Sequence, residues 1–420
     1  MPRSRDALVW LALAAGFAGL AFTLGGQAGA LLSRPGRNAV DLVPIWCHAR
    51  ALVAGEWDCG PEVMRVVFGR APIGPDLGQS GAYYYPPTTA LLFLVSTTGT
   101  FEQAARGFRA LSVLSLLGAG FAIAFTAPPR SRLLGVAGGV AVAAAFFALR
   151  ISRGSLLAGQ TGPLMVGISA AALWAAGRQR DRLSGTLAAV GLALKLSPVL
   201  LLPALFRRRA WVLVFGVVVF GLSVVVMSLT GHDSPTRWFL GALAFTDRPM
   251  HAAWAGQEPP WVLVLWRWRL WGLGVPTAFL VLWSAVRPAG RDHEVATAFV
   301  LMAFGGAVMA GSQQTHEALV LLPALGWVLV WPVQEGPRWR SLAVSLLLAA
   351  YMVKLGVGSS FSPPNSLAWL PIAALTWCGC VARWAWSRRR AVSGGPQASA
   401  YAPTSAPILA PTSTQIAASS

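Results

Sequence analysis

Carboxylates are scarce in this sequence, and one of them, Asp41, has an unusual position. The chain contains 15 acidic residues among 420. Asp41 follows a long apolar stretch and opens segment 42–53, in which apolar residues recur at roughly helical spacing. A carboxylate placed there can act as a general base toward a hydroxyl group. An acidic residue at the start of a helix is also a common cap, so the local pattern supports catalysis and capping equally.

Other side chains with binding chemistry lie in or beside apolar stretches. Lys195 stands inside one of them, shortly before Pro198, and a charge in such a position indicates either a functional site or a structural counter-ion. The run Tyr83–Tyr85 can stack on a sugar or line a lipid groove. His316 and Glu317 open a later apolar stretch. The sequence has no Cys/His cluster with zinc spacing, no Walker loop, no GxSxG elbow and no D-x-D pair, so we expect no metal and no cofactor.

The composition defines the elements that must position these residues. Hydrophobic residues make up 55% of the chain and charged residues only 11%, with a mean hydropathy of +0.59. Soluble domains carry about 25% charged residues, so the sequence predicts an all-α polytopic membrane protein. The net charge of +18 comes from basic residues that are scattered over short loops. The positive-inside rule explains this excess, and we expect no nucleic-acid partner.

Apolar stretches long enough for membrane helices follow one another along the chain. The first, residues 7–26, has a basic start and no clear cleavage site, and it is predicted to be an uncleaved helix with its N-terminus in the cytoplasm. The other stretches are 86–101, 110–127, 133–149, 161–177, 183–206, 210–230, 261–286, 295–312, 317–333, 341–357 and 367–386. Residues 387–420 are mostly small, polar and proline-rich, and are predicted to form a disordered cytoplasmic tail after a membrane domain of residues 1–386.

Arginine clusters orient these helices. Cytoplasmic loops are predicted at 177–182, 206–211, 287–291, 336–340 and 387–390. Segments 312–317 and 358–366 contain no lysine or arginine and are predicted to face out. Segment 183–206 has basic loops at both ends and a Lys-Leu-Ser-Pro break, which favours a broken or re-entrant helix pair. Residues 28–85 and the loop 150–161 then both lie outside, which leaves 86–101 as a partial element that does not cross.

Two of the four cysteines fall in the predicted outer segment. Cys47 and Cys59 would lie in an oxidising compartment, where a disulfide can form, and their spacing permits a bridge without requiring one. Cys378 and Cys380 lie in the last apolar stretch and are predicted to be packing residues. The sequence leaves the pairing of Cys47 open.

The order of these features resembles glycosyltransferase family 87, within the C-type superfamily of polytopic enzymes that use polyprenyl-phosphate sugars. That family includes polyprenol-phosphate-mannose-dependent alpha-mannosyltransferases. The matching pieces are Asp41 with "W…ARALVAG" (46–55), "YYYPPTTALLF" (83–93), "GQTG" (159–162), "GLALKLSPVLLLPALFRRRAW" (191–211) and "SQQTHEALVLLPAL" (312–325). "AGQEPPW" (255–261) is an imperfect version of the family's "NQS" loop, because the asparagine and the serine are absent.

The resemblance implies a C-type glycosyltransferase fold of about 11–13 transmembrane or re-entrant helices. An interfacial helix at 42–53 is expected to turn its apolar side to the bilayer. The implied activity is inverting transfer of a hexose, expected to be mannose, from a polyprenyl-phosphate donor to a lipid-linked or glycolipid acceptor at the outer face of the cell membrane. Asp41 matches the family's acid and is the expected general base, with His316 as the second catalytic residue. The expected substrate-binding residues are Arg37, Arg50, Tyr84, Tyr85, Gln160, Lys195, Gln257 and Lys354, with Arg150 and Arg153 as further outer cations.

A different class of protein also uses polar groups in a polytopic membrane chain. In a transporter or flippase for a lipid-linked sugar, Asp41, Lys195 and His316 would be relay or recognition groups. Inverted repeats or additional acids within the membrane would favour that class, and the sequence shows neither. The transferase is therefore the first hypothesis and the flippase the alternative.

Overall fold

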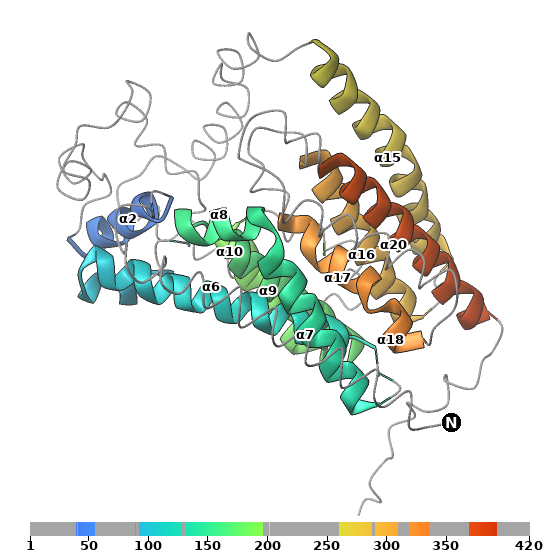
Figure 1. Ribbon diagram of the computed structural model, residues 1–420, viewed down its shortest axis with the longest axis horizontal. Helices are drawn as coiled ribbons and strands as arrows, with labels where there is room; N and C mark the ends of the chain where they lie inside the picture. Colours follow the sequence, from blue (N-terminus) through green and yellow to red (C-terminus); the bar gives the residue numbers. More distant parts are fainter. Residues whose placement is uncertain are drawn as a thin grey trace, which may run out of the picture.

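The structure is a computed structural model, and it describes residues 39, 41–54, 89, 92–127, 129, 131–195, 201, 260–287, 290–309, 319–335 and 369–392. All regular elements in these ranges are helices, and none is a strand. The predicted all-α class is confirmed for this part of the chain. Figure 1 shows two groups of long helices that pack side by side.

The first group precedes residue 196. It consists of α2 (Val43–Ala54), the short 3₁₀ helix η1 (Leu94–Thr98), α6 (Phe101–Ala124), α7 (Arg132–Ala148), α8 (Arg150–Ala158), α9 (Gly162–Gly177) and α10 (Asp181–Leu194). The second group consists of α15 (Pro260–Val286), α16 (Arg291–Met309), α17 (Leu322–Leu329), α18 (Trp331–Glu335) and α20 (Trp369–Val392). α9 and α17 join the groups, since α9 contacts α16 and α17.

The sequence explains where several helices begin and end. α6 starts with a capping box, in which the Gln103 backbone N–H donates to Thr100 Oγ1 and the Thr100 N–H donates to Gln103 Oε1 at 2.9 Å. α10 ends at Lys195, whose backbone is extended (φ −163°, ψ 152°). Pro198 follows, and a proline cannot continue a helix. The predicted break at Lys195 is confirmed.

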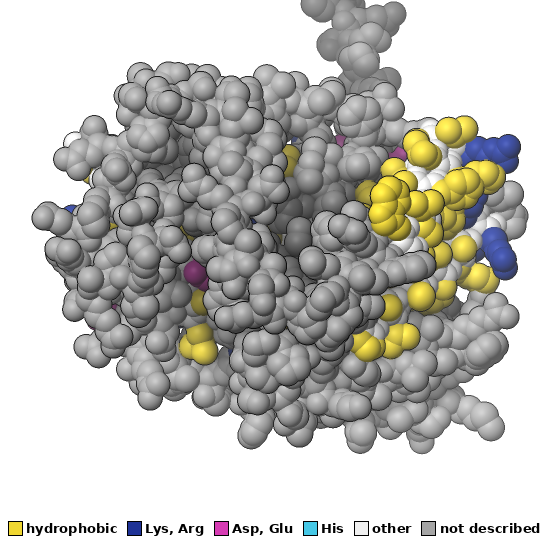
Figure 2. All heavy atoms as spheres, turned by 90° about the horizontal axis from the view of Figure 1, so that it is seen from above, with side chains coloured by type: hydrophobic (Ala, Val, Ile, Leu, Met, Phe, Trp, Pro, Cys, Tyr) yellow, Lys and Arg dark blue, Asp and Glu magenta, His cyan; other side chains and the backbone are white. Residues whose placement is uncertain are grey.

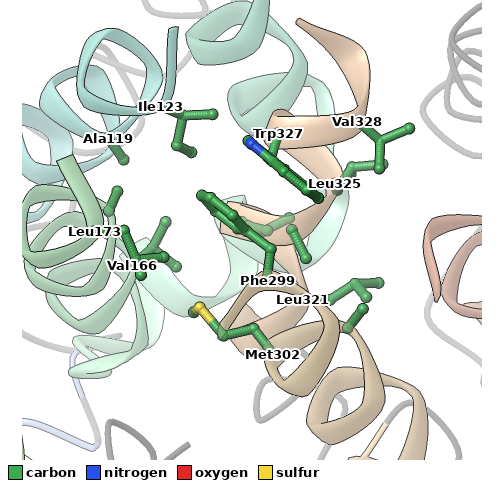
Figure 3. Packing of buried hydrophobic residues seen from close by; sticks show 14 of the residues in the cluster. Ala119, Ile123, Val166, Leu173, Phe299, Met302, Leu321, Leu325, Trp327 and Val328 are labelled. Atoms are coloured by element: carbon green, nitrogen blue, oxygen red, sulfur yellow. The ribbon is translucent and has the colours of Figure 1, made fainter. Parts of the chain in front are cut away.

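The core lies between the two groups of helices. Phe299 of α16 stacks on Trp327 of α17 with ring centroids 4.6 Å apart, and both side chains are buried (Figure 3). Small residues let α6 and α7 approach closely, because a Cβ atom on Gly120 would lie 2.6 Å from the carbonyl oxygen of Gly139. This packing fixes the ends of the helices relative to one another.

One end of the bundle is rich in arginine, and we call it the arginine end. There the Arg178 guanidinium, after α9, donates to the Phe125 carbonyl, after α6, at 3.2 Å. The buried Arg383 of α20 donates to Gln334 of α18, and Gln334 donates to the Ala124 carbonyl at 2.8 Å. Further arginines at the ends of α9, α15 and α20 are Arg180, Arg287, Arg388, Arg389 and Arg390.

Asp41 lies at the opposite end, which we call the Asp41 end. Its backbone N–H donates to the carbonyl of Ala158, the last residue of α8, at 3.0 Å. Thr89 Oγ1 donates to the carbonyl of Leu194, the last residue of α10, at 3.2 Å. Residues 150–161 therefore lie beside Asp41, and their position outside the membrane stays a prediction.

The sequence predicts many stretches of membrane-spanning length, and the structure shows fewer. Among the described residues, α6 alone is long and apolar enough to cross a membrane, and the pair α7 and α8, bent by 70°, would add a second if it counts as one span. Shorter apolar helices cover 162–177, 271–286 and 319–329. In segment 86–101 the described residues include η1 and the start of α6, and the prediction that the segment does not cross the membrane stays a prediction. The stretches 7–26, 210–230 and 341–357 lie outside the described residues.

Three predictions need correction. The apolar side of α2 does not face a bilayer, because Leu42, Ile45 and Trp46 are buried against α6 and α9. Residues 150–158 form helix α8 and not a loop. α20 continues to Val392, so the predicted domain boundary at residue 386 falls inside a helix. The rest of the predicted tail lies outside the described residues.

Candidate functional site

Asp41 stands one position outside the cap of α2. The Leu42 carbonyl accepts the first hydrogen bond of that helix, from the Trp46 N–H at 3.0 Å, which makes Leu42 the cap residue. The Asp41 carboxylate, through Oδ2, accepts a hydrogen bond from Nε2 of Gln160 at 2.7 Å. This contact bridges two segments 119 residues apart in the chain. The carboxylate is thus directed at the α8–α9 connection, which does not support the capping interpretation.

Gly159 makes this contact possible. It ends α8 in the left-handed conformation, with φ +72° and ψ 35°, a region that glycine adopts without steric cost. A Cβ atom at this position would lie 2.9 Å from Leu42 Cβ and 3.2 Å from Ala39 Cβ. Only a residue without a side chain lets the Asp41 segment lie directly on the α8–α9 connection.

Two further family-like segments reach the same end of the bundle. Leu319, from "SQQTHEALVLLPAL", packs on Gly162, because a Cβ atom on that glycine would lie 2.6 Å from Leu319 Cδ1. Thr89, from "YYYPPTTALLF", donates to the end of α10, next to Lys195. The five segments that carry the resemblance therefore meet at the Asp41 end through described residues.

The predicted cations are placed in different ways. Arg50 of α2 is exposed and stacks over the Trp46 ring, 5.0 Å from its centroid. Lys195 is partly buried at the end of α10. Arg153 lies on α8 with its Nε buried. Arg37, Tyr84, Tyr85, Gln257, His316 and Lys354 lie outside the described residues.

Arg109 is a functional candidate that the sequence analysis missed. It lies on α6, is buried, and donates through Nη2 to the Leu157 carbonyl of α8 at 3.2 Å. Arg109 stands just before the apolar stretch 110–127, and a charge inside an apolar helix is by default a functional-site hypothesis. The predicted apolar stretch began at residue 110, whereas α6 begins at Phe101. With the correct start, Arg109 would have counted as a charge inside the helix.

Several polar atoms of α8 and of the α8–α9 connection are buried without a hydrogen-bond partner in the described part of the chain. They are Gln160 Oε1, Thr161 Oγ1, Ser152 Oγ and Ser155 Oγ. Buried polar groups are normally paired, so a cluster of unpaired ones calls for an explanation. No group of three His, Cys, Asp or Glu side chains that can hold a metal occurs among the described residues.

Cys47 of α2 is disulfide-bonded, whereas Cys378 and Cys380 of α20 are free. The proposed partner of Cys47 in the sequence analysis, Cys59, lies outside the described residues. Cys380 is buried, as predicted for a packing residue, and Cys378 is exposed. The Asp41 end thus carries an oxidised cysteine and the second helix group carries reduced ones.

The described part of the chain is thus an all-α bundle with a carboxylate, an amide and cations at one end. Residues 83–353, which make up more than half of the chain, match the model of Glycosyltransferase family 87. The chain belongs to this family and is a glycosyltransferase, as the sequence resemblance indicated. No curated protein and no solved structure matches it. Asp41 precedes the matched range, so its place in the site rests on its contact with Gln160, which lies inside that range.

Proposed function

We propose that the chain is a multi-pass membrane glycosyltransferase that moves a hexose, mannose in the first instance, from a polyprenyl-phosphate donor to a lipid-linked or glycolipid acceptor. The reaction takes place at the outer face of the cell membrane. The observation that carries this proposal is the Asp41 carboxylate, held by the Gln160 amide at 2.7 Å where the family-like segments meet. A carboxylate fixed in this way is suited to be the base of an inverting transfer.

The chemistry requires no nucleotide and no metal in this proposal. The acceptor hydroxyl attacks the anomeric carbon while Asp41 takes its proton. The bond from that carbon to the phosphate oxygen breaks, and its electron pair leaves with the polyprenyl phosphate. Cations at the Asp41 end, namely Arg50, Arg153 and Lys195, are the groups that can hold the developing phosphate charge.

His316 is proposed to act with Asp41, and chain connectivity supports this role. Leu319 packs on Gly162, two residues from Gln160. Three residues of extended chain span at most about 11 Å, so His316 stays within that distance of Leu319. In the proposed mechanism its imidazole orients the carboxylate or contacts the donor phosphate.

Three observations support a membrane position with the Asp41 end outside. A cluster of described arginines (Arg178, Arg180, Arg287 and Arg388–Arg390) lies at the opposite end, as expected for a cytoplasmic face. The disulfide of Cys47 fits an oxidising compartment. Large apolar side chains are exposed in a helical stripe on α15, which suits contact with lipid tails: Trp271, Val275, Phe279, Leu282 and Val286. Figure 2 shows hydrophobic side chains gathered on the side where α15 lies, with basic side chains at their border.

We expect the two ends to label from opposite sides of the membrane. In a variant with Cys378→Ser and Cys380→Ala, a cysteine replaces either the exposed Ala54 of α2 or the exposed Gln179 after α9. A membrane-impermeant maleimide should label Ala54→Cys in intact cells and Gln179→Cys only after the cells are opened. Labelling of both sites, or of Gln179→Cys alone, in intact cells contradicts the orientation.

The proposed donor is tested with purified full-length enzyme. Synthetic polyprenyl-phosphate mannose, and the corresponding glucose and galactose compounds, are incubated with a lipid extract from cells that lack the gene. We expect one lipid product to gain a hexose with mannose as the preferred donor. A deletion strain that accumulates an undecorated carrier on the inner leaflet, together with no transfer in vitro, would instead favour the flippase.

A further inference from the structure

The amide of Gln160 has a defined orientation because of its partner. An ionised carboxylate only accepts hydrogen bonds, so the group that faces Asp41 Oδ2 must be the NH₂ of the amide. The carbonyl oxygen, Oε1, therefore points away from the carboxylate. This assignment follows from the chemistry of the pair and not from the appearance of the two amide atoms.

Oε1 of Gln160 is buried and accepts no hydrogen bond within the described part of the chain. Burial of an acceptor atom removes its hydrogen bond to water, and without a replacement donor this costs free energy. The backbone around it cannot relax easily, because the Gln160 N–H donates to the Ser155 carbonyl at 3.0 Å and Gly159 is wedged against Leu42. The acceptor oxygen is thus held in place without its donor.

Thr161, the next residue, repeats this arrangement. Its side chain is fully buried, and Oγ1 has no partner among the described residues. The hydroxyl precedes α9 but makes no capping hydrogen bond to that helix. Two adjacent residues of the α8–α9 connection therefore each have an unused hydrogen-bonding atom, and Gln160 is the one in contact with the proposed base.

We propose that Gln160 binds the substrate directly: Oε1 accepts a hydrogen bond from a sugar hydroxyl next to the one that reacts. This inference rests on the proposed function and deepens it. One amide then orients the base through its NH₂ and selects the sugar through its oxygen. The substrate class is a sugar with a free hydroxyl beside the reacting centre, on either the acceptor or the donor.

The proposal is tested by removing the Gln160 amide and the sugar hydroxyl separately and together, and by asking whether the two losses of kcat/KM depend on each other. Wild type and Gln160→Met are compared with alkyl α-mannosides as acceptors, each lacking one hydroxyl, and with monodeoxy forms of the mannose donor. For one analogue, wild type should lose about 10–100-fold in kcat/KM relative to the parent sugar, because Oε1 loses its donor. Gln160→Met should lose less than about 3-fold on the same analogue, since its thioether is only a weak acceptor.

Two further variants separate the roles of the amide. Gln160→Lys keeps donors for Asp41 but has no acceptor, so it should be as indifferent to the missing hydroxyl as Gln160→Met. Gln160→Glu keeps an acceptor oxygen, so it should retain the discrimination. The negative charge that it adds beside the Asp41 carboxylate should disfavour ionisation of the base and move the rising limb of the pH–rate profile to higher pH. Gln179→Met is the matched control, because Gln179 is exposed at the arginine end and an unbranched side chain replaces another.

The outcomes are distinct. If wild type loses more kcat/KM than Gln160→Met on a deoxy acceptor, the hydroxyl that Gln160 binds is on the acceptor. If the difference occurs with a deoxy donor, that hydroxyl is on the donor. Equal discrimination by wild type and Gln160→Met on every analogue overturns the proposal and leaves Gln160 as a positioning residue for Asp41. Equilibrium binding of the same sugars to both proteins is measured in parallel by calorimetry. Absence of transfer by wild type then refutes the proposed donor, while the binding comparison still decides the role of Gln160.

Discussion

Asp41→Asn is expected to reduce hexose transfer by about 10²–10⁴-fold, because an amide cannot take the proton of the acceptor hydroxyl. The side-chain oxygen of the introduced asparagine can still accept the hydrogen bond from Gln160 Nε2, so the α2 segment should keep its position. Folding and donor binding should therefore be close to those of wild type. The measurement is the initial rate of transfer by purified enzyme at saturating polyprenyl-phosphate mannose.

Asp181→Asn is the matched control for this change. Asp181 lies in the first turn of α10 at the arginine end, far from the proposed chemistry. Asp181→Asn makes the same chemical change as Asp41→Asn, and it should leave the rate of transfer unaffected. An Asp41→Asn enzyme that works within a few-fold of wild type would remove the base from the proposed mechanism.

Gly159→Ala is expected to lower kcat/KM by about 10²-fold, because a displacement of about 1 Å at a reacting group can cost that much. The added methyl group would lie 2.9 Å from Leu42 Cβ, so the Asp41 segment must move away from α8. The left-handed backbone adds a cost of about 1–2 kcal/mol for any residue with a Cβ atom. Transfer rates and thermal unfolding of the purified variant measure the two effects.

Gly290→Ala separates the steric displacement from the backbone cost. Gly290 also has a positive φ, +91°, but nothing lies within 4 Å of its would-be Cβ atom. Gly290→Ala should lose stability through the backbone cost alone and should retain transfer. Similar losses of activity in both variants would show that the close approach to Leu42 does not position Asp41.

Part of the fold could be predicted because it depends on local chemistry. The break after α10 follows from the proline beyond Lys195, and the opposite ends of the bundle follow from the positions of the arginines. The apolar period of segment 42–53 predicts a helix, which the structure confirms as α2. The same period could not tell what covers its apolar side. Periodicity records that a face is apolar, whereas the neighbours that bury it, α6 and α9, come from distant sequence.

The pairing at the site was beyond sequence reasoning for the same reason. Asp41 and Gln160 are both candidates on the sequence alone, but nothing local links residues 119 positions apart. The glycine and serines of α8 favour a loop, and the prediction of a loop there is wrong. Its helical form places the end of α8 on Asp41, and only the packing of Gly159 against Leu42 reveals this.

The hydrogen bond from Arg109 joins the end of α8 to α6. Arg109 lies eight residues after Phe101, the first residue of α6, and eight residues at 1.5 Å correspond to about 12 Å along the helix. The hydrogen bond therefore holds the end of α8 against α6 through a buried guanidinium near Gln160. In the proposed reaction, a donor phosphate that reaches Asp41 would meet this buried cation at the Asp41 end. A charge contact in a buried setting is stronger than one in water, so the buried guanidinium would favour donors whose charge the protein can neutralise.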